Sequence, residues 1–284
     1  MANINWYPGH MAKTKRLILE KLSFIDIIFE VVDARMPYSS KIKDLDKFTR
    51  NKPRLMIMTK YDLCDKKVTN EWISKYEKEG YTVLPMDISK GINKKVILDK
   101  TSSIMSEVNL KREKKGLKEK KTRILIVGIP NVGKSTLINR LVNKNVTKTG
   151  NKPGVTKGLE WIRINNDFEL LDSPGILWPK ISSEKEALNL ASLTAIKEEV
   201  LPISDVAYYI VETLVKYYPK ELENRYKIEV NEDVILTMEE IGKRRGCLVK
   251  GGIVDLDKVY NIVINDVKNG NISNITFDRC VDFE

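Results

Sequence analysis

A glycine-rich loop gives the clearest chemical signal in this 284-residue sequence. The stretch Gly128-Ile-Pro-Asn-Val-Gly-Lys-Ser135 fits the pattern G-x-x-x-x-G-K-S, with a β-rich run before it and a helical run after it. Its two glycines allow the backbone to curl so that successive N–H groups point at phosphate oxygens. The following helix N-terminus adds free donors and a positive partial charge. We therefore predict a phosphate site, and a glycine-rich turn without a ligand is the weaker alternative.

Each residue type in this loop suits a bound phosphate chain. We expect the Lys134 ammonium to lie against the β- and γ-phosphates and the Ser135 hydroxyl to offer a hard oxygen to magnesium. The residues expected to contact the phosphates are Asn131, Val132, Gly133, Lys134, Ser135 and Thr136.

Two segments that follow the loop fit the same site. Leu170-Leu-Asp172-Ser-Pro-Gly175 has the pattern D-x-x-G at the end of a predicted strand, 37 residues after Ser135. We expect Asp172 to hold magnesium through water and the Gly175 N–H to sense the γ-phosphate. Thr156 lies between the two segments, where it either gives magnesium a second hydroxyl or is an ordinary turn residue.

The choice of base depends on Thr59-Lys60-Tyr61-Asp62, which closes another β-rich run. A carboxylate at Asp62 can accept two hydrogen bonds, from guanine N1–H and from the exocyclic amine, whereas adenine offers no such pair. The stem of Lys60 would lie across the base. The alternative is that this segment is only a polar turn before Leu63. The segment favours GTP and argues against an ATP-using enzyme.

The elements that must position these residues follow from the hydrophobic pattern. Short apolar runs alternate with helical stretches, which is typical of an α/β fold with an open sheet buried on both faces. The predicted strands are 25–32, 54–58, 82–86, 123–127, 159–164 and 168–171, and the predicted helices lie near 11–22, 67–80, 92–109 and 134–143. After residue 179, helical spacing recurs at 188–196, 206–217, 234–243 and 256–267. We predict a mostly parallel six-stranded α/β domain over 1–179 and a smaller all-α domain over 180–284.

Charge is distributed unevenly over these two parts. The net charge of the chain is +10; residues 1–179 carry 35 Lys and Arg against 20 Asp and Glu, and residues 180–284 carry 14 against 19. The basic part is suited to a polyanion such as RNA, although a Lys-rich surface also serves solubility. The run 111–123 holds eight basic residues and reads as a linker or a frayed helix end. A second cluster, a candidate RNA contact, is Lys243, Arg244, Arg245 and Lys250.

Composition excludes several classes of protein. Three widely separated cysteines and a single histidine exclude a disulfide scaffold and a Cys/His zinc site. No run approaches the roughly 18 apolar residues of a membrane span, and the N-terminus lacks the features of a secretory signal. We expect a cytosolic protein without a membrane partner.

The segments together resemble the motifs of TRAFAC-class GTPases, written in a circularly permuted order. T-K-x-D at 59–62 and Asp87-Ile88-Ser89 precede the phosphate loop, whereas P-G-V-T and D-x-P-G follow it. Over essentially the whole chain, the sequence is similar to the ribosome biogenesis GTPase A family. The segments that carry this likeness are W6-Y-P-G-H-M11, V32-D-A-R35, G128-I-P-N-V-G-K-S-T136, D172-S-P-G-I-L-W-P179 and G246-C-L-V-K-G-G252.

The resemblance implies a GTP-hydrolysing factor in late assembly of the large (50S) ribosomal subunit. It implies GTP or GDP with magnesium in the site, and a helical C-terminal domain that contacts rRNA. The expected partner is the large-subunit precursor, both its rRNA and its ribosomal proteins, and we expect a monomer. A nucleotide-gated RNA-binding adaptor with little hydrolysis is the alternative.

The residues expected to act in GTP hydrolysis are also inferred from the resemblance. Many GTPases place a Gln after D-x-x-G to orient the attacking water, but here that residue is Ile176, which cannot hold water. The family points instead to His10, whose imidazole could position water at neutral pH; otherwise His10 merely begins a helix. Lys134, Thr156 and Gly175 would complete the catalytic set. Asn131 resembles the Asn that coordinates potassium in cation-stimulated members, and is otherwise a turn residue.

Two positions depart from the family pattern. Thr59 stands where Asn is usual, so its hydroxyl either replaces the amide contact to guanine N7 or that contact weakens. Asp87 and Ile88 stand where a small polar pair is usual, but a backbone N–H could still reach guanine O6.

Overall fold

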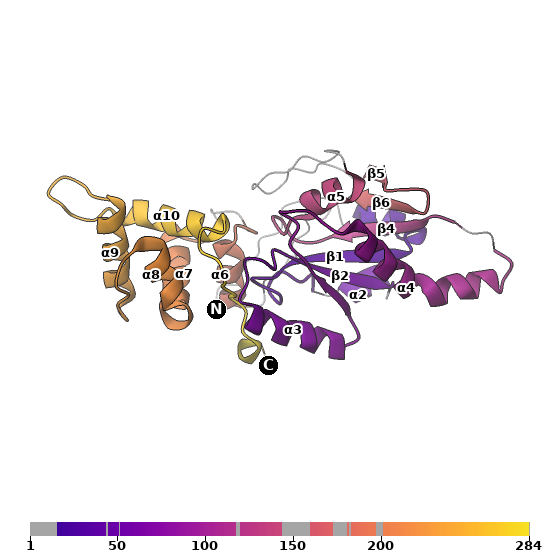
Figure 1. Cartoon of the computed structure of the whole chain (residues 1–284), viewed down its shortest axis with the longest axis horizontal. Helices are drawn as coiled ribbons and strands as arrows, with labels where there is room; N and C mark the ends of the chain where they lie inside the picture. Colours follow the sequence, from indigo (N-terminus) through magenta and orange to yellow (C-terminus); the bar gives the residue numbers. More distant parts are fainter. Residues whose placement is uncertain are drawn as a thin grey trace.

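The computed structural model describes residues 16–43, 45–50, 52–117, 120–143, 160–172, 181, 183–196 and 201–283. Its centre is a six-stranded sheet of order β3-β2-β1-β4-β6-β5 (Figure 1). All neighbouring strands are parallel except β5, which runs antiparallel to β6 at the edge. The strands are β1 (Ile27–Asp33), β2 (Arg54–Thr59), β3 (Thr82–Pro85), β4 (Thr122–Val127), β5 (Glu160–Arg163) and β6 (Phe168–Asp172). The predicted α/β fold with a mostly parallel sheet is confirmed.

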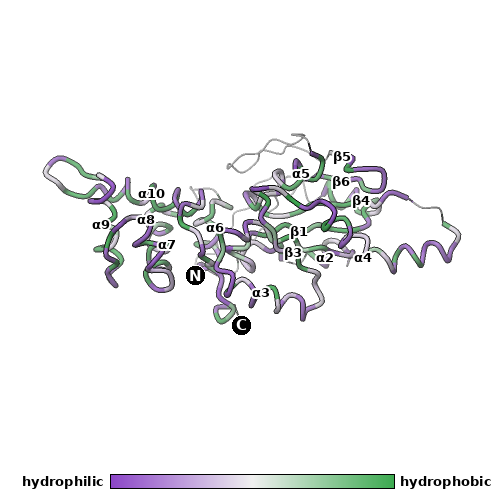
Figure 2. The backbone as a smooth tube through the Cα atoms, viewed as in Figure 1, coloured by the Kyte–Doolittle hydropathy of each residue, from purple (hydrophilic) through white to green (hydrophobic). Residues whose placement is uncertain are grey.

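Helices cover both faces of this sheet because successive side chains of a strand point to opposite faces. In β2, Met56 and Met58 pack in one cluster with Trp72 of α3 (Lys66–Lys78). Leu55 and Ile57 pack in the other cluster, which includes residues of α4 (Lys94–Glu113) and α5 (Lys134–Val142). Figure 2 shows the apolar residues concentrated along the strands. The near-continuous apolar runs in the sequence therefore reflect a sheet that is buried on both sides.

Local sequence explains where these helices begin and end. The carboxylate of Asp65 caps α3 by accepting from the N–H groups of Lys67 and Val68. Helix α4 continues four residues beyond its predicted end, so the first residues of the basic run 111–123 form its last turn. This end of α4 is hydrophilic and projects from the sheet (Figures 1 and 2). The short helix α2 (Leu45–Thr49), which the hydrophobic pattern did not indicate, precedes β2.

In the described residues after β6, five α-helices pack together. They are α6 (Glu184–Ser192), α7 (Ile203–Tyr217), α8 (Pro219–Tyr226), α9 (Val234–Arg245) and α10 (Leu256–Lys268). Side chains of Ser183, Asp233 and Asp255 cap α6, α9 and α10. Helix α8 was not predicted; it starts with proline at its first turn, where the missing N–H costs nothing. We refer to residues 183–271 as the helical module.

The last residues of the chain return to the sheet domain. Phe277 donates its N–H to the Arg35 carbonyl at 2.8 Å, and Ile275 donates to the Leu63 carbonyl at 3.2 Å. The indole N–H of Trp72 donates to the carbonyl of Asp278 at 3.1 Å. In Figure 1 this yellow segment runs from α10 to α3. The predicted domain boundary at residue 180 does not account for this return of the last residues to the sheet domain. The position of the boundary stays a prediction.

The topology brings the functional loops to one edge of the sheet. Parallel strands end at the same edge, and ligands of open α/β sheets bind there. The segments 59–62, 86–89 and 128–133 follow β2, β3 and β4 at this edge. Among the residues that the structure describes, no helix is both long and apolar enough to span a membrane.

Candidate functional site

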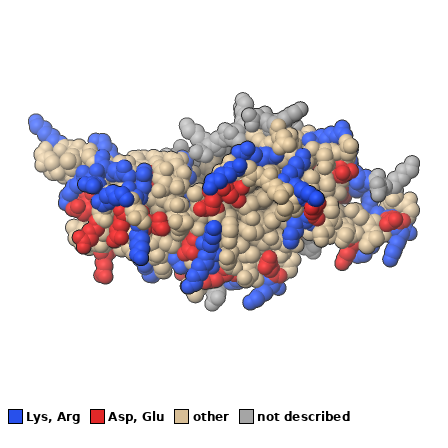
Figure 3. All heavy atoms as spheres, in the orientation of Figure 1, with Lys and Arg blue, Asp and Glu red and all other residues tan. Residues whose placement is uncertain are grey.

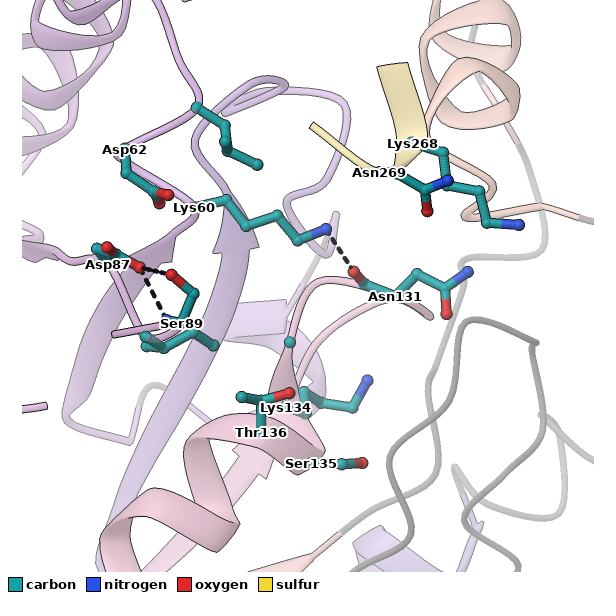
Figure 4. Close-up of a pocket in the computed structure, with 13 residues that line it drawn as sticks. Lys60, Asp62, Asp87, Ser89, Asn131, Lys134, Ser135, Thr136, Lys268 and Asn269 are labelled. Carbon is teal, nitrogen blue, oxygen red and sulfur yellow. Dashed lines mark hydrogen bonds between the residues drawn. The ribbon is translucent and has the colours of Figure 1, made fainter. Parts of the chain in front are cut away.

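A pocket of about 360 Å³ opens at this edge of the sheet. Figure 4 shows its side chains converging from the loops after β2, β3 and β4 and from the end of α10. The residues that line it are Lys60, Asp62, Leu63, Asp87, Ile88, Ser89, Asn131, Gly133, Lys134, Ser135, Thr136, Lys268 and Asn269. The pocket therefore combines the predicted base segment with the predicted phosphate loop.

The two glycines of the phosphate loop are required by close contacts. Gly133 has φ +96°, and a Cβ atom there would lie 2.8 Å from Cδ1 of Ile88. A Cβ atom on Gly128 would lie 2.5 Å from the carbonyl oxygen of Val31 in β1. Any larger residue would push the loop away from β1 and from the segment that follows β3. The glycines thus permit both the curled backbone and its tight packing against the sheet.

Lys134 is held inside the phosphate loop. Its side chain is buried, and Nζ donates to the carbonyl oxygens of Gly128 at 3.0 Å and of Ile129 at 2.8 Å. Burial lowers the pKa of Lys134 to about 8, although the charge of Asp172 opposes this shift. A phosphate chain would add negative charge beside this ammonium and stabilise it. Lys134 is therefore positioned to bind an anion.

The residues expected to serve magnesium fit a hard cation. Asp172 is buried at the carboxyl end of β6, close enough to Lys134 for their charges to interact. Ser135, in the first turn of α5, lines the pocket. One carboxylate and one hydroxyl are the donor set that magnesium uses when phosphates supply other ligands. When bound, magnesium would neutralise phosphate charge.

The segment 59–62 is joined directly to the phosphate loop. Lys60 Nζ donates to the carbonyl oxygen of Asn131 at 2.8 Å and forms a 2.8 Å ion pair with Oδ2 of Asp33. Thr59 Oγ1 lies 2.6 Å from the carbonyl oxygen of Val132. The contacts of Lys60 with Asn131 and of Thr59 with Val132 join residues more than 70 positions apart. The segment 59–62 and the phosphate loop therefore line one pocket.

The contacts of Thr59 bear on whether its hydroxyl replaces the usual amide contact to guanine N7 or leaves that contact weaker. A hydroxyl has one proton, and the Val132 carbonyl at 2.6 Å and the Val32 carbonyl at 3.0 Å are both acceptors for it. Thr59 is fully buried between them. In this arrangement Thr59 takes over the link between strand and loop and has no proton for N7, which favours a weaker contact at that atom.

Two carboxylates face the place expected for the base. Asp62 lines the pocket, and its pKa is raised by burial and by the nearby charge of Asp87. Oδ1 of Asp87 accepts from the N–H of Ser89 at 2.8 Å and from its hydroxyl at 2.6 Å. Although burial opposes it, these two donors lower the pKa of Asp87. Asp87 is therefore occupied in shaping its own turn, whereas Asp62 is directed to the pocket.

A buried ion pair that supports Lys60 was not assigned a role from the sequence. Asp33, at the end of β1, is completely buried and accepts from Arg35 Nε at 3.1 Å and Nη2 at 3.0 Å. Burial alone would raise its pKa, but Arg35 and Lys60 outweigh this and hold the pKa of Asp33 well below its usual range. A carboxylate directly at the end of a buried strand was the available sequence signal. Asp33 positions Lys60.

The helical module also contributes residues that sequence reasoning missed. Lys268 and Asn269, at the end of α10, line the pocket next to Asn131 (Figure 4). The side-chain amide of Asn131 donates to the carbonyl oxygen of Thr194 at 2.6 Å. No local pattern marks these three partners, because only the packing of the two halves brings them to the loop.

Other predicted residues lie elsewhere. His10, Thr156 and Gly175 lie outside the described residues. The cluster formed by Lys243, Arg244, Arg245 and Lys250 is exposed, at the end of α9 and in the turn after it. Figure 3 shows Lys and Arg side chains gathered over this end of the helical module, and Figure 1 places α9 far from the pocket. This cluster can therefore serve a separate contact.

Known proteins are similar to this chain in both sequence and fold. The family described as "50S ribosome-binding GTPase" matches residues 123–240. "Ribosome biogenesis GTPase A" of Priestia megaterium is 44% identical over 277 residues, which are 97% of this chain and 96% of the relative. The protein of the same name from Thermotoga maritima is 31% identical over 276 residues, covering 97% of this chain and 94% of the relative.

Solved structures agree with this relationship. GNP-bound YlqF from T. maritima matches with a TM-score of 0.65 and 26% identity, over 94% of this chain and 98% of the other. A GDP-bound YlqF structure matches with a TM-score of 0.66 over the same share of this chain. One pocket that joins the Asp62 segment to a phosphate loop agrees with these relatives. The chain belongs to the ribosome biogenesis GTPase A family and is a GTPase.

Proposed function

We propose that this GTPase acts in late maturation of the large (50S) ribosomal subunit, and that the subunit stimulates its turnover. The observation that carries the nucleotide assignment is the pocket in which Lys60 joins the Asp62 segment to the phosphate loop. The ribosomal assignment is supported by the names of the relatives, which are ribosome biogenesis GTPases, and by the family description. The expected partner is a subunit precursor, with the protein acting as a monomer in the cytoplasm.

Within the site, we assign each group one role. Asp62 selects guanine, Lys60 lies along the base, and the N–H groups from Asn131 to Thr136 together with Lys134 hold the phosphates. The backbone at Asp87 and Ile88 faces guanine O6. Ser135, Asp172 and Thr156 hold magnesium, the Gly175 N–H contacts the γ-phosphate, and His10 positions water. The roles of Thr156, Gly175 and His10 rest on sequence similarity alone.

Potassium is proposed as a second cation next to Asn131. The side-chain amide nitrogen of Asn131 donates to the Thr194 carbonyl oxygen, which fixes the orientation of the side chain, and an amide oxygen is a hard donor that suits a cation. A potassium ion between phosphates would add positive charge where an arginine finger acts in other GTPases.

One measurement tests the proposal. GTP turnover is followed with and without purified large subunits, in potassium and in sodium buffers. We expect subunits to raise turnover at least about tenfold, which lies well below what partner proteins achieve elsewhere, and His10→Ala to lose this increase. Turnover that ignores large subunits would favour the adaptor alternative, and equal rates in potassium and sodium would remove the role of Asn131.

The basic end of α9 is the proposed rRNA contact. We expect charge reversal of Lys243, Arg244 and Arg245 to weaken subunit binding and to reduce its salt dependence, because fewer counterions are released. Reversal of three exposed lysines of α3, Lys66, Lys67 and Lys78, controls for the change in net charge. Equal losses in the two triple variants would show that total charge, rather than this cluster, determines binding.

A further inference from the structure

The wall of the pocket next to Asn131 comes from the helical module. Lys268 ends α10 and Asn269 follows it, and both line the pocket whose other walls belong to the sheet domain. Figure 4 shows the two side chains on the same side as Asn131, opposite Asp87 and Ser89. The nucleotide pocket is therefore completed by a second structural unit.

The backbone on both sides of these two residues is anchored to the sheet domain. Before them, the carbonyl oxygen of Val267 accepts a 2.8 Å hydrogen bond from Nη1 of Arg35, which is almost completely buried. After them, Gly270 has φ +75° and packs so closely on Leu63 that a Cβ atom would lie 3.0 Å from Leu63 Cδ1. Leu63 adjoins the guanine-selecting Asp62. Lys268 is thus held at the pocket by its neighbours in the chain.

Two other lysines in the pocket already have hydrogen-bond or ion-pair partners within the protein. Lys60 is paired with the buried carboxylate of Asp33, and the ammonium of Lys134 donates to two carbonyl groups of its own loop. Lys268 is half-buried and lines the pocket from the α10 end, next to Asn131 of the phosphate loop (Figure 4). A flexible four-carbon stem lets its ammonium reach an anion in the pocket.

We infer that Lys268 contacts the phosphate part of the bound guanine nucleotide, and that this contact ties the helical module to the sheet domain when nucleotide is present. Asn269 provides a polar amide on the same wall. The inference rests on the proposed use of this pocket for GTP. Its consequence is that nucleotide binding and the orientation of the ribosome-contacting module are linked through α10, whose other end leads to α9.

The test compares nucleotide affinity in three variants of the full chain. We measure dissociation constants for GDP and for a non-hydrolysable GTP analogue at low and at high salt. Lys268→Gln should weaken binding about fivefold at low salt, a loss typical of a partly exposed charge contact, and salt should shrink the loss. Lys268→Arg should retain wild-type affinity. Lys258→Gln, which removes a charge from the opposite end of α10, should also bind as wild type does.

The outcomes separate this inference from the proposed function. Wild-type affinity in Lys268→Gln, or a loss that high salt leaves unchanged, overturns the contact while leaving GTP binding intact. Failure of the wild-type protein to bind either nucleotide overturns the proposed function and the inference together. Unfolding of the nucleotide-free variants is compared as well, because a purely structural role would lower stability without changing the salt dependence of affinity.

Discussion

Lys60 Nζ and the carbonyl oxygen of Asn131 are 2.8 Å apart, although 71 residues separate them in the chain. This hydrogen bond joins the loop after β2 to the loop after β4, across the intervening strand β1. Asp33, at the end of β1, binds the same ammonium. Three neighbouring strand ends therefore share one partly buried polar contact, which links the segment 59–62 to the phosphate loop.

Guanine selection should depend on Asp62. Asp62→Asn removes the carboxylate that accepts from N1–H and the exocyclic amine, so GTP affinity should fall by about 10- to 100-fold, the loss of a charged hydrogen bond. The new amide can donate to the 2-oxo group of xanthine, so xanthosine triphosphate should now bind. Nucleotide titrations of wild type and variant measure both effects.

The matched control is the neighbouring carboxylate. Asp87→Asn changes a side chain whose oxygen accepts from Ser89, and should keep the preference for guanine over xanthine. If the two variants change preference alike, the assignment of the base contact to Asp62 is wrong.

Thr59 should contribute mainly to stability. Thr59→Val keeps the shape of the side chain but leaves the buried Val132 carbonyl without its donor, which should cost about 1 to 3 kcal/mol of unfolding free energy. Urea denaturation measures this loss. Thr101→Val is the control: its hydroxyl donates to the Ile97 carbonyl inside α4, which also accepts an intrahelical bond, so less is lost. Equal losses at the two sites would contradict a special role for the Val132 contact.

Arg35 should be among the most costly residues to replace. Arg35→Met leaves the buried Asp33 with Lys60 as its remaining ion pair and removes the donor to Val267, which should cost about 3 to 5 kcal/mol. Denaturant unfolding measures the loss. In the double variant with Asp33→Asn, the buried carboxylate that lost its Arg35 partner is no longer charged, so the combined loss should be smaller than the sum of the single losses. Additive losses would argue against a coupled pair.

Stability should depend on pH through Asp278. Burial raises the pKa of Asp278 to about 6, although donors from Tyr38, Ser39 and Asn189 favour its charged form. In the unfolded chain the carboxyl group of Asp278 has a pKa of about 3.9. The folded state therefore binds a proton at Asp278 more tightly than the unfolded state does. The contribution of Asp278 to stability is therefore fully present below about pH 4 and declines as pH rises through about 6.

The variant Asp278→Asn cannot titrate, so it isolates this contribution. The difference in unfolding free energy between wild type and variant should be larger near about pH 4 than near about pH 7. Asp282→Asn, in the same segment but paired with Lys185 at the surface, should change stability by less than about 1 kcal/mol. A difference that is constant over this range would contradict the raised pKa.

Much of the sheet domain could be predicted because its signals are local. The apolar runs of β1, β2 and β4 are buried on both faces, so they differ plainly from the amphipathic helices between them. The phosphate loop was recognisable because glycine at positions 128 and 133 meets steric demands that no other residue satisfies. Asp172 and Asp62 could be proposed as site residues because Asp172 ends β6 and Asp62 follows the end of β2, at the edge where such sheets bind ligands.

The sequence by itself determined the α/β pattern and indicated which residues are suited to bind phosphate and guanine, since those properties belong to side-chain chemistry and to short, locally folded segments. Tertiary structure alone decided that Thr59 bonds to Val132, that Arg35 reaches the Val267 carbonyl, and that Lys268 enters the pocket. It also decided that the final residues pack beside α3. Such contacts join positions far apart in the chain, and they arise only when distant parts of the folded chain pack together, so no spacing within the sequence records them.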